Sequence, residues 1–444
     1  MRRTLGIGAA VALAAVAGIA LFGRGDGTGA EIRPVAASRQ AATQAPRDIA
    51  RLVEQFSAAP TRKVVERLET EARGEAATPA TFALLGLGYQ QLFRESGDPT
   101  WLKRAGSALR KGRDGAPSDP VAVTGLAQLA VTQHRFNDGD TLARAALRLD
   151  PLSSAARGAL GDALFNLGRY DAAFAEYDRL AAAGPSVAAY ARVAFARQLE
   201  GRRLAAIDAM GLALEAGSGI PEQEAWAQVQ YGNMLLGVGR LAAAGRAYES
   251  ALDLSPGYVH AEAGLARVDA ARGRYSRSAG RLRRVIERLP SPQYAILLTD
   301  VLRKAGRAQE AKKADDLVDA LEQLFAANGV RTELSTAVHD LDRGVRVADA
   351  LARAQAAYEA APSVGAADAV AWGLYRSGRC DEARAWALEA GRLGTKDALF
   401  AFHRAMIERC LGNDNAARTG FRDALRLDPN FSYRWNSVAA RLAA

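Results

Sequence analysis

The sequence predicts an all-helical solenoid, in which antiparallel pairs of α-helices stack one after another along the chain. One observation is a repeated helix ending of the form Ala-Leu-x-Leu-x-Pro. It occurs at residues 146–151, 251–256 and 424–429. A second observation is a Gly-Arg-Tyr turn between such endings, at residues 168–170 and 273–275. A third is the period, because Pro185 follows Pro151 by 34 residues, which is a common length for a unit of two helices.

Glycine, proline and a register of small residues support the pairing of helices. Glycine adopts the left-handed conformation that closes a helix, and proline cannot continue one. Small residues recur where we expect the two helices of a pair, or neighbouring pairs, to touch closely. In first helices these are Ala127, Gly161, Ala194, Gly232, Ala266, Ala371 and Ala405. In second helices they are Gly139, Ala173, Ala206, Ala244, Ala279, Ala311, Ala383 and Ala417. Large residues such as Tyr177 and Tyr248 are expected where the seam is wider.

The repeats also set the expected domain boundaries. Residues 79–431 should form the solenoid, with about nine to ten helix pairs. The pattern predicts a long second helix ending near Ala327, and it is degenerate over residues 331–363. Residues 47–78 and 432–444 are expected to form capping helices, because the terminal units of a solenoid otherwise expose an apolar face.

Residues 1–30 have the pattern of a signal peptide or a signal anchor. Two arginines precede an uncharged run at residues 5–22 that is rich in Ala, Val, Leu and Gly. This run is long for a secretory hydrophobic region and short for a spanning helix, so it either anchors the chain or is removed near Ala30. Residues 31–46 read as a flexible linker. We therefore expect an extracytoplasmic protein, membrane-anchored by residues 5–22 or secreted after cleavage.

Several stretches of the chain carry a resemblance to a known superfamily. They lie at residues 160–164, 190–193, 324–330, 369–375 and 393–399. Together with the turns and endings above, they resemble the tetratricopeptide repeat (TPR) superfamily. The order of the units is also similar to that of bacterial, mainly actinobacterial, multi-repeat proteins without an assigned role. The superfamily resemblance implies a right-handed superhelix that binds protein segments, without catalytic residues or cofactors.

The same resemblance implies a concave groove lined by the first helix of each pair. Residues expected to face a protein or peptide partner there are Asp162, Phe165, Asn166, Phe195, Trp226, Asn233, Arg267, Arg303, Trp372, Tyr375, Arg376, Phe402 and Arg409. Aromatic and arginine side chains dominate the energetics of many interfaces, so the groove as a whole favours binding. For any single one of these residues, packing between repeats or idle surface is the favoured interpretation. On this placement, Trp226→Ala and Trp372→Ala would weaken binding without unfolding the chain.

Charge and motif content argue against other classes of function. The formal net charge is +9, but arginines are interspersed with acidic residues and no aromatic residues alternate with them to stack bases. This disfavours a nucleic acid partner, and a cytoplasmic regulatory or nucleic-acid-associated protein remains the alternative. None of the four histidines has a neighbour at metal-ligand spacing, and no phosphate-binding loop occurs. We therefore predict no metal, no cofactor and no enzymatic activity.

Cys380 and Cys410 are the only cysteines and fall in consecutive units. Two interpretations remain open at this point. An exported chain would favour a disulfide between them, whereas a small apolar role in the core is the plainer alternative.

Overall fold

The computed structural model describes residues 61–75 and 77–444, and it folds them into 22 α-helices without a β-strand. The expected signal segment, the linker and the first part of the expected amino-terminal cap lie outside these residues. Among the described helices, none is long and apolar enough to cross a membrane.

The helices follow one another as antiparallel pairs, and the two helices of a pair pack on each other throughout. A single helix, α2 (Thr61–Arg73), comes first. The next pairs are α3 (Pro79–Ser96) with α4 (Thr100–Gly115), α5 (Pro120–Thr132) with α6 (Phe136–Leu149), α7 (Ser154–Asn166) with α8 (Tyr170–Ala183), α9 (Val187–Leu199) with α10 (Arg203–Ala216), and α11 (Pro221–Gly237) with α12 (Leu241–Leu254).

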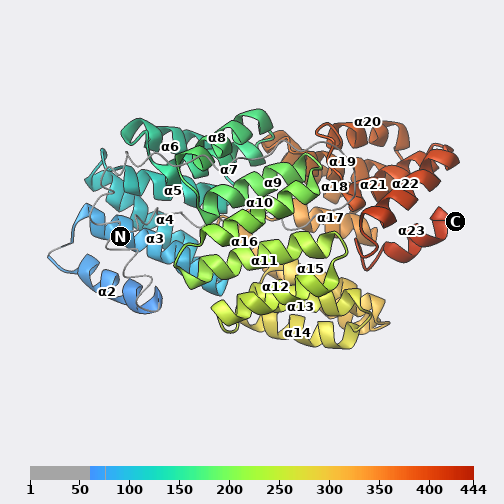
Figure 1. The fold of residues 1–444 in the computed structure, drawn as a ribbon, viewed down its shortest axis with the longest axis horizontal. Helices are drawn as coiled ribbons and strands as arrows, with labels where there is room; N and C mark the ends of the chain where they lie inside the picture. Colours follow the sequence, from blue (N-terminus) through green and yellow to red (C-terminus); the bar gives the residue numbers. More distant parts are fainter. Residues whose placement is uncertain (1–60, 76) are drawn as a thin grey trace.

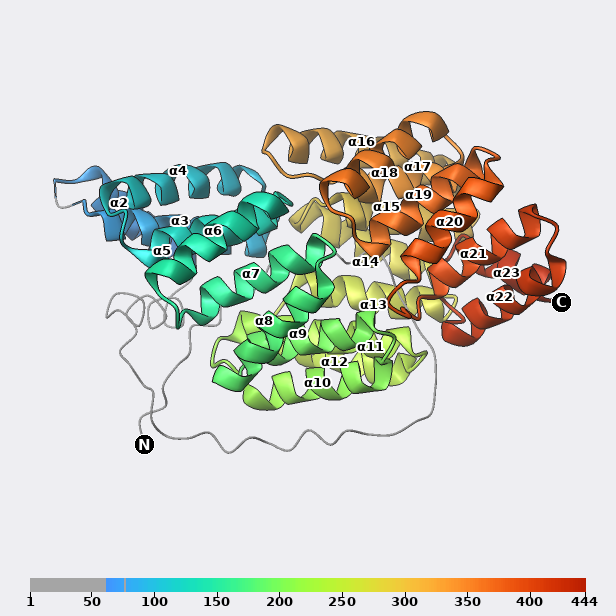
Figure 2. The ribbon, with the colours of Figure 1, turned by 90° about the horizontal axis from the view of Figure 1, so that it is seen from above.

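The second half of the chain continues the same arrangement. Its pairs are α13 (Val259–Ala271) with α14 (Tyr275–Arg288), α15 (Pro292–Lys304) with α16 (Ala308–Ala327), α17 (Glu333–Arg343) with α18 (Val347–Ala360), α19 (Val364–Arg376) with α20 (Cys380–Ala390), and α21 (Ala398–Cys410) with α22 (Asp414–Leu427). A short helix, α23 (Asn436–Ala443), packs on α22. Helices α2 to α6 lie at one end of the molecule and α20 to α23 at the other (Figures 1 and 2).

The turns within the pairs form for the reasons that the sequence indicates. Gly168 lies between α7 and α8 with φ of 69°, and the N–H of Arg169 donates to the carbonyl of Leu164 at 3.0 Å. This is the hydrogen-bond pattern of a left-handed helix cap. His134 takes the equivalent place between α5 and α6 and adopts φ of 57°, a conformation that costs a residue with a Cβ more than it costs glycine.

The core is a series of seams between helices, filled mainly by Ala, Leu and Val, and at two seams a tyrosine lies against a glycine. The ring of Tyr248 on α12 is buried, and a Cβ added to Gly232 on α11 would lie 2.6 Å from its Cε1 atom. Gly161 on α7 stands in the same relation to Tyr177 on α8. The small residues of the predicted register therefore make room for large ones on the partner helix.

First helices form the inner layer of the array. The first helices of successive pairs pack on each other, as in α3 on α5, α11 on α13, and α17 on α19. Second helices do not do so to the same extent, and an array of this kind curves with its first helices on the inside. We call the surface of α5, α7, α9, α11, α13, α15, α17, α19 and α21 that points away from the second helices the inner face.

Several contacts join residues that lie 194–197 positions apart in the sequence. The hydroxyl of Tyr170 accepts from the N–H of Val364, and the hydroxyl of Thr395 donates to the carbonyl of Leu199 at 2.6 Å. The sequence separations of these two contacts are 194 and 196. Contacts between the ends of α5 and α16 recur at separations of 195 and 197. Successive turns of the superhelix therefore touch at helix ends and connecting loops.

Candidate functional site

Four of the residues expected in the groove are buried in the core. They are Asp162, Phe165, Trp372 and Phe402. Trp372 and Phe402 have 0% of their surface exposed, so neither side chain is open to a ligand in this structure. The expectation that Trp372→Ala would leave the fold intact therefore has to be corrected, because removing a buried tryptophan side chain leaves a large cavity.

Asp162 is half of a buried ion pair. Its two carboxylate oxygens accept from Nε and Nη2 of Arg192 at 2.9 and 2.8 Å, and one also accepts from the hydroxyl of Tyr177. Burial raises the pKa of Asp162, and the charge of Arg192 opposes that shift. Asn166 donates to the backbone carbonyl of Asp162. These side chains connect α7, α8 and α9 and have their hydrogen bonds satisfied within the fold.

The other expected groove residues are partly exposed or, for Arg409, exposed. Phe195 and Trp226 lie edge to face with ring centroids 6.3 Å apart. The structure also brings Asn233 and Arg267 together, with Nη1 of Arg267 donating to Oδ1 of Asn233 at 3.0 Å. Three more side chains are partly exposed. Arg303 lies on α15, and Tyr375 and Arg376 lie on α19.

A non-helical segment, residues 432–435, crosses the inner face. The hydroxyl of Tyr433 donates to the backbone carbonyl of Arg267 on α13 at 3.0 Å. Arg434 lies beside Asp300 on α15, and the indole N–H of Trp435 donates to Oδ1 of Asp342 on α17 at 2.9 Å. We call these residues the crossing segment. The expected capping helix over 432–444 thus begins only at Asn436.

Asp342 is the central acceptor beneath the crossing segment. Its Oδ1 accepts from the indole N–H groups of both Trp372 and Trp435, at 3.0 and 2.9 Å. Its backbone carbonyl accepts from Nη1 of both Arg376 and Arg434, at 3.2 and 3.4 Å. One residue thus holds a tryptophan and an arginine from α19 and another such pair from the crossing segment.

The ring of Trp435 completes an aromatic cluster on α19 and α21. It stacks on Phe402 with centroids 5.5 Å apart and meets Trp372 edge to face at 5.7 Å. On the other side of Trp372, His403 stacks at 4.1 Å. Tyr433 contacts α13, Arg434 contacts α15, and Trp435 contacts α17, α19 and α21. The crossing segment therefore contacts five consecutive first helices.

The ion pair between Arg434 and Asp300 is poorly satisfied. Nε of Arg434 lies 3.5 Å from Oδ1 of Asp300, and neither atom has a hydrogen-bond partner within the described residues. Burial raises the pKa of Asp300, while the nearby charge of Arg434 lowers it. A charged pair held out of water without close hydrogen bonds contributes little net stability.

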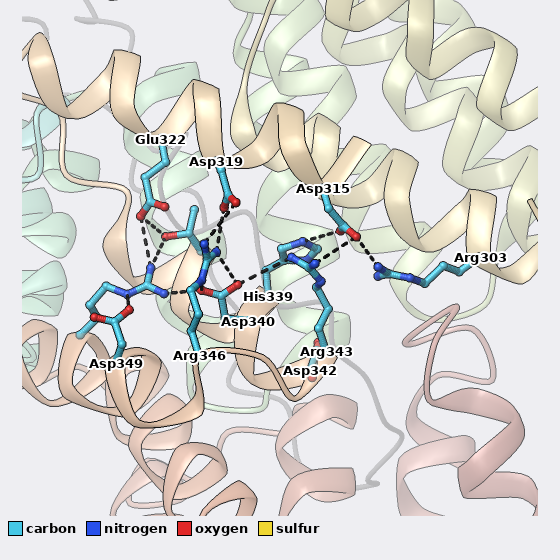
Figure 3. Close-up of polar contacts among 12 residues, drawn as sticks. Arg303, Asp315, Asp319, Glu322, His339, Asp340, Asp342, Arg343, Arg346 and Asp349 are labelled. Carbon is cyan, nitrogen blue, oxygen red and sulfur yellow. Dashed lines mark hydrogen bonds and ion pairs between the residues drawn. The ribbon is translucent and has the colours of Figure 1, made fainter. Parts of the chain in front are cut away.

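A network of ion pairs supports α17 from the side of α16 and α18 (Figure 3). The buried carboxylate of Asp315 on α16 accepts from Arg303 on α15 and lies 3.2 Å from Nη2 of Arg343. It also contacts Nε2 of His339 at 3.1 Å. Burial by itself would raise the pKa of Asp315, but the bond to His339 and the charges of both arginines lower it overall.

A second buried carboxylate, Asp340, anchors the other half of this network. It accepts from Nε and Nη2 of Arg346 at 3.0 and 2.8 Å and from Nη2 of Arg353. Arg346 also bonds to Asp319, so that α16, α17 and α18 are tied together by charge (Figure 3). This network fixes the position of α17, and with it the position of Asp342.

The two cysteines are joined in the structure. Cys380 at the start of α20 and Cys410 at the end of α21 form a disulfide with a Cα–Cα distance of 6.2 Å. This distance lies within the range that a disulfide requires. Of the two interpretations that the sequence left open, the structure favours the bond.

The described part of the chain offers neither a metal site nor a separate ligand pocket. No group of three or more His, Cys, Asp or Glu residues there could hold a metal ion. A surface pocket lies where two turns of the superhelix meet, lined by Gly168, Pro362 and Arg392 among others. Arg392 already donates to the carbonyls of the other two, so this pocket belongs to the seam.

Sequence reasoning did not place Asp342, Arg434 or Trp435 at a site. All three lie in stretches whose repeat pattern is degenerate or absent. The tryptophan and arginine of the crossing segment were visible in the sequence, but no spacing connected them to an aspartate more than 90 residues earlier.

Comparison with known proteins supports the repeat architecture. Residues 124–188 and residues 235–301 each match a family model described as tetratricopeptide repeat. These matches support placing the chain in the TPR superfamily, whose members generally mediate protein–protein interactions. No curated protein matches the sequence.

Two solved structures are among those that match this chain. One is the crystal structure of the APC/C hetero-tetramer Cut9-Hcn1, with 13% identity and a TM-score of 0.34 over 89% of this chain and 95% of that chain. The other comes from the functional characterization of Pseudomonas aeruginosa pilF, with 18% identity and a TM-score of 0.34 over 48% of this chain and 92% of that chain.

Proposed function

We propose that this protein is a non-catalytic interaction scaffold whose inner face binds an extended segment of a partner protein. The observation that carries the proposal is the crossing segment itself. This four-residue turn contacts α13, α15, α17, α19 and α21 through the side chains of Tyr433, Arg434 and Trp435, and it bonds to Arg267 and Asp342. A surface that accommodates one such segment has the shape and hydrogen-bonding groups to bind another.

The charge distribution favours a protein partner over a nucleic acid. Asp300 and Asp342 lie where the crossing segment binds, and a phosphate backbone would be repelled by them. Many arginines are already in ion pairs with acidic residues, as Arg343 and Arg346 are with Asp315 and Asp340.

The proposal includes export, with residues 5–22 as the anchor or as part of a signal cleaved near Ala30. Support comes from the composition of that segment and from the disulfide between Cys380 and Cys410, because disulfides persist in oxidising compartments. Fractionation of a tagged protein, with protease added to intact spheroplasts, tests this part. Digestion of the body in intact spheroplasts is the expected result, and complete protection would instead favour the cytoplasmic alternative.

Site-specific photo-crosslinking tests the scaffold proposal. The photoreactive amino acid p-benzoylphenylalanine would replace Lys304 on α15, whose Nζ lies 3.2 Å from Oγ of Ser437 beside the crossing segment. The matched control replaces Lys312, an exposed lysine on the neighbouring second helix, α16. We expect crosslinks to a second protein from position 304 and none from position 312.

The same pair of variants can overturn the proposal. Equal crosslinking from both positions would mean that the inner face has no special role. Absence of any crosslinked protein from both, in cells that express the chain at its normal level, would argue against a scaffold.

A further inference from the structure

We infer that the crossing segment is an internal mimic of the partner, and that the inner face of α13–α21 binds, in trans, a segment with the order tyrosine-arginine-tryptophan. This inference rests on the proposed scaffold function and names the chemistry of its partner. The chain would then regulate itself, because the crossing segment and the partner compete for one surface.

Three side chains give this surface its selectivity. The hydroxyl of Tyr433 meets a backbone carbonyl, the guanidinium of Arg434 meets Asp300, and the indole N–H of Trp435 meets Asp342. Each pairing places a donor of the segment against an acceptor of the inner face. A partner that lacked one of these donors would lose one hydrogen bond or ion pair to the inner face, while Trp372 and Arg376 would still bond to Asp342.

The arrangement around Asp342 supports the assignment independently. On α19, Trp372 and Arg376 bond to the carboxylate and the carbonyl of this residue. Trp435 and Arg434 of the crossing segment bond to the same two groups. Asp342 therefore binds a tryptophan and an arginine together. Two of its four side-chain donors come from the crossing segment, which lies outside the helix pairs.

The crossing segment is also held in a way that permits exchange. Nε and Nη2 of Arg434 are buried without hydrogen-bond partners, and so is Oδ1 of Asp300. An external peptide has no connection to α22 and α23, so its arginine can approach Asp300 more closely. Departure of the segment moves α23, which packs on α22, and uncovers Trp372 and Phe402, which an incoming tryptophan would cover again.

A peptide-binding experiment on the full chain tests the inference. The probe is a fluorescein-labelled synthetic peptide with the sequence of residues 429–438, and its binding is followed by fluorescence anisotropy. The opened variant carries Tyr433→Ala, Arg434→Ala and Trp435→Ala. We expect it to bind the peptide at least about tenfold more tightly than the unmodified chain does, and a scrambled peptide to bind neither.

A second comparison isolates the charge contact. In the opened variant, Asp300→Asn should weaken binding of the peptide several-fold. The same substitution should leave binding of a peptide with glutamine in place of arginine unchanged, because that peptide has no cation for Asp300. Equal weakening of both peptides would contradict the assigned role of Asp300.

Folding is controlled by a milder variant and by a direct measurement. Arg434→Ala alone removes the ion pair with Asp300 and the bond to the carbonyl of Asp342 but keeps Tyr433 and Trp435, so the chain should keep its fold and bind the peptide more tightly than the unmodified chain. Thermal unfolding by circular dichroism shows whether the triple substitution retains the fold.

The outcomes separate this inference from the scaffold proposal. If position 304 crosslinks a partner but the peptide binds neither variant, the scaffold stands and the inference fails. If the opened variant dimerises and ignores the peptide, the segment exchanges between two copies of the chain, and the inference also fails. If the peptide binds as expected but no partner crosslinks, the inner face binds such a segment in trans, but the scaffold proposal fails and the segment mimics no partner.

Discussion

The regular pair α11–α12 and the irregular region α15–α18 are held together by different forces. In the regular pair, the ring of Tyr248 fits against Gly232, and the seam is apolar. In the irregular region, buried positions hold the carboxylates of Asp315 and Asp340, neutralised by arginines from three helices. The regular seam requires only that a large side chain on one helix lies against a small one on the other. The ion pairs of the irregular region also fix the orientation of α17, and so they place Asp342 against the crossing segment.

The largest effect should come from breaking the charged seam. Asp340→Ala removes a buried acceptor and leaves Arg346 and Arg353 without their shared partner. We expect a loss of about 4 kcal/mol in the free energy of unfolding, because buried Asp340 accepts three hydrogen bonds from charged arginines and all three are lost. Urea unfolding measures it. Glu382→Ala, in an exposed pair with Arg379, is the control and should change nothing measurable.

The next effect concerns the covalent link in the carboxyl-terminal pairs. Cys380→Ser with Cys410→Ser opens a loop between residues 30 positions apart. Loss of this constraint on the unfolded chain should lower the free energy of unfolding by about 3 kcal/mol. Reduction of the unmodified chain with dithiothreitol should lower the melting temperature to the same value. Two freely reactive thiols in the native, unreduced protein would contradict the assigned bond.

The crossing segment should respond to pH, while the regular seam should not. Burial raises the pKa of Asp428, which immediately precedes the segment, to about 7. The folded chain therefore binds a proton that the unfolded chain releases near pH 4, so this stability is present at low pH and is lost as pH rises through 7.

This pH effect can be isolated with one substitution. Between pH 5 and pH 8 the unmodified chain should lose about 2 kcal/mol relative to Asp428→Asn, which cannot titrate. Comparison of the two chains cancels the opposite contribution of His134 and His260, whose pKa values burial lowers to about 4. Parallel stability curves for the two chains would contradict the prediction.

The smallest effect tests the regular seam. Gly232→Ala places a methyl group 2.6 Å from Cε1 of the buried ring of Tyr248. We expect a loss of about 1–2 kcal/mol, because overpacking outweighs the gain in helix propensity. Gly245→Ala, on α12 with no atom within 4 Å of the added group, should instead stabilise by up to about 1 kcal/mol. Destabilisation by both substitutions alike would remove the distinction between seam and surface.

The regular region could be predicted from sequence because its determinants are local. A glycine turn, a proline ending and a tyrosine opposite a glycine all lie within one 34-residue period, as at Gly161 and Tyr177. The end of α16 at Ala327 could also be predicted from its helical pattern.

The candidate site could not be predicted in the same way, because it depends on distant parts of the chain. Asp342 and Trp435 are 93 residues apart, and Arg267 and Tyr433 are 166 apart. Contacts of this kind depend on how tightly the superhelix winds, which small packing angles set over many pairs. Trp372 was assigned to the groove because its helix faces inward, but residues 432–435 and Phe402 cover it.

Fluorine NMR of the full chain labelled with 5-fluorotryptophan tests the central claim most directly. The chain has five tryptophans, and Trp435→Phe identifies the resonance of Trp435. On addition of the peptide of residues 429–438, this resonance should move to the position of an exposed indole, while that of Trp386, which packs on Tyr358, stays in place. If the peptide binds and the Trp435 resonance does not move, the peptide and the crossing segment do not share a site, and the account is contradicted.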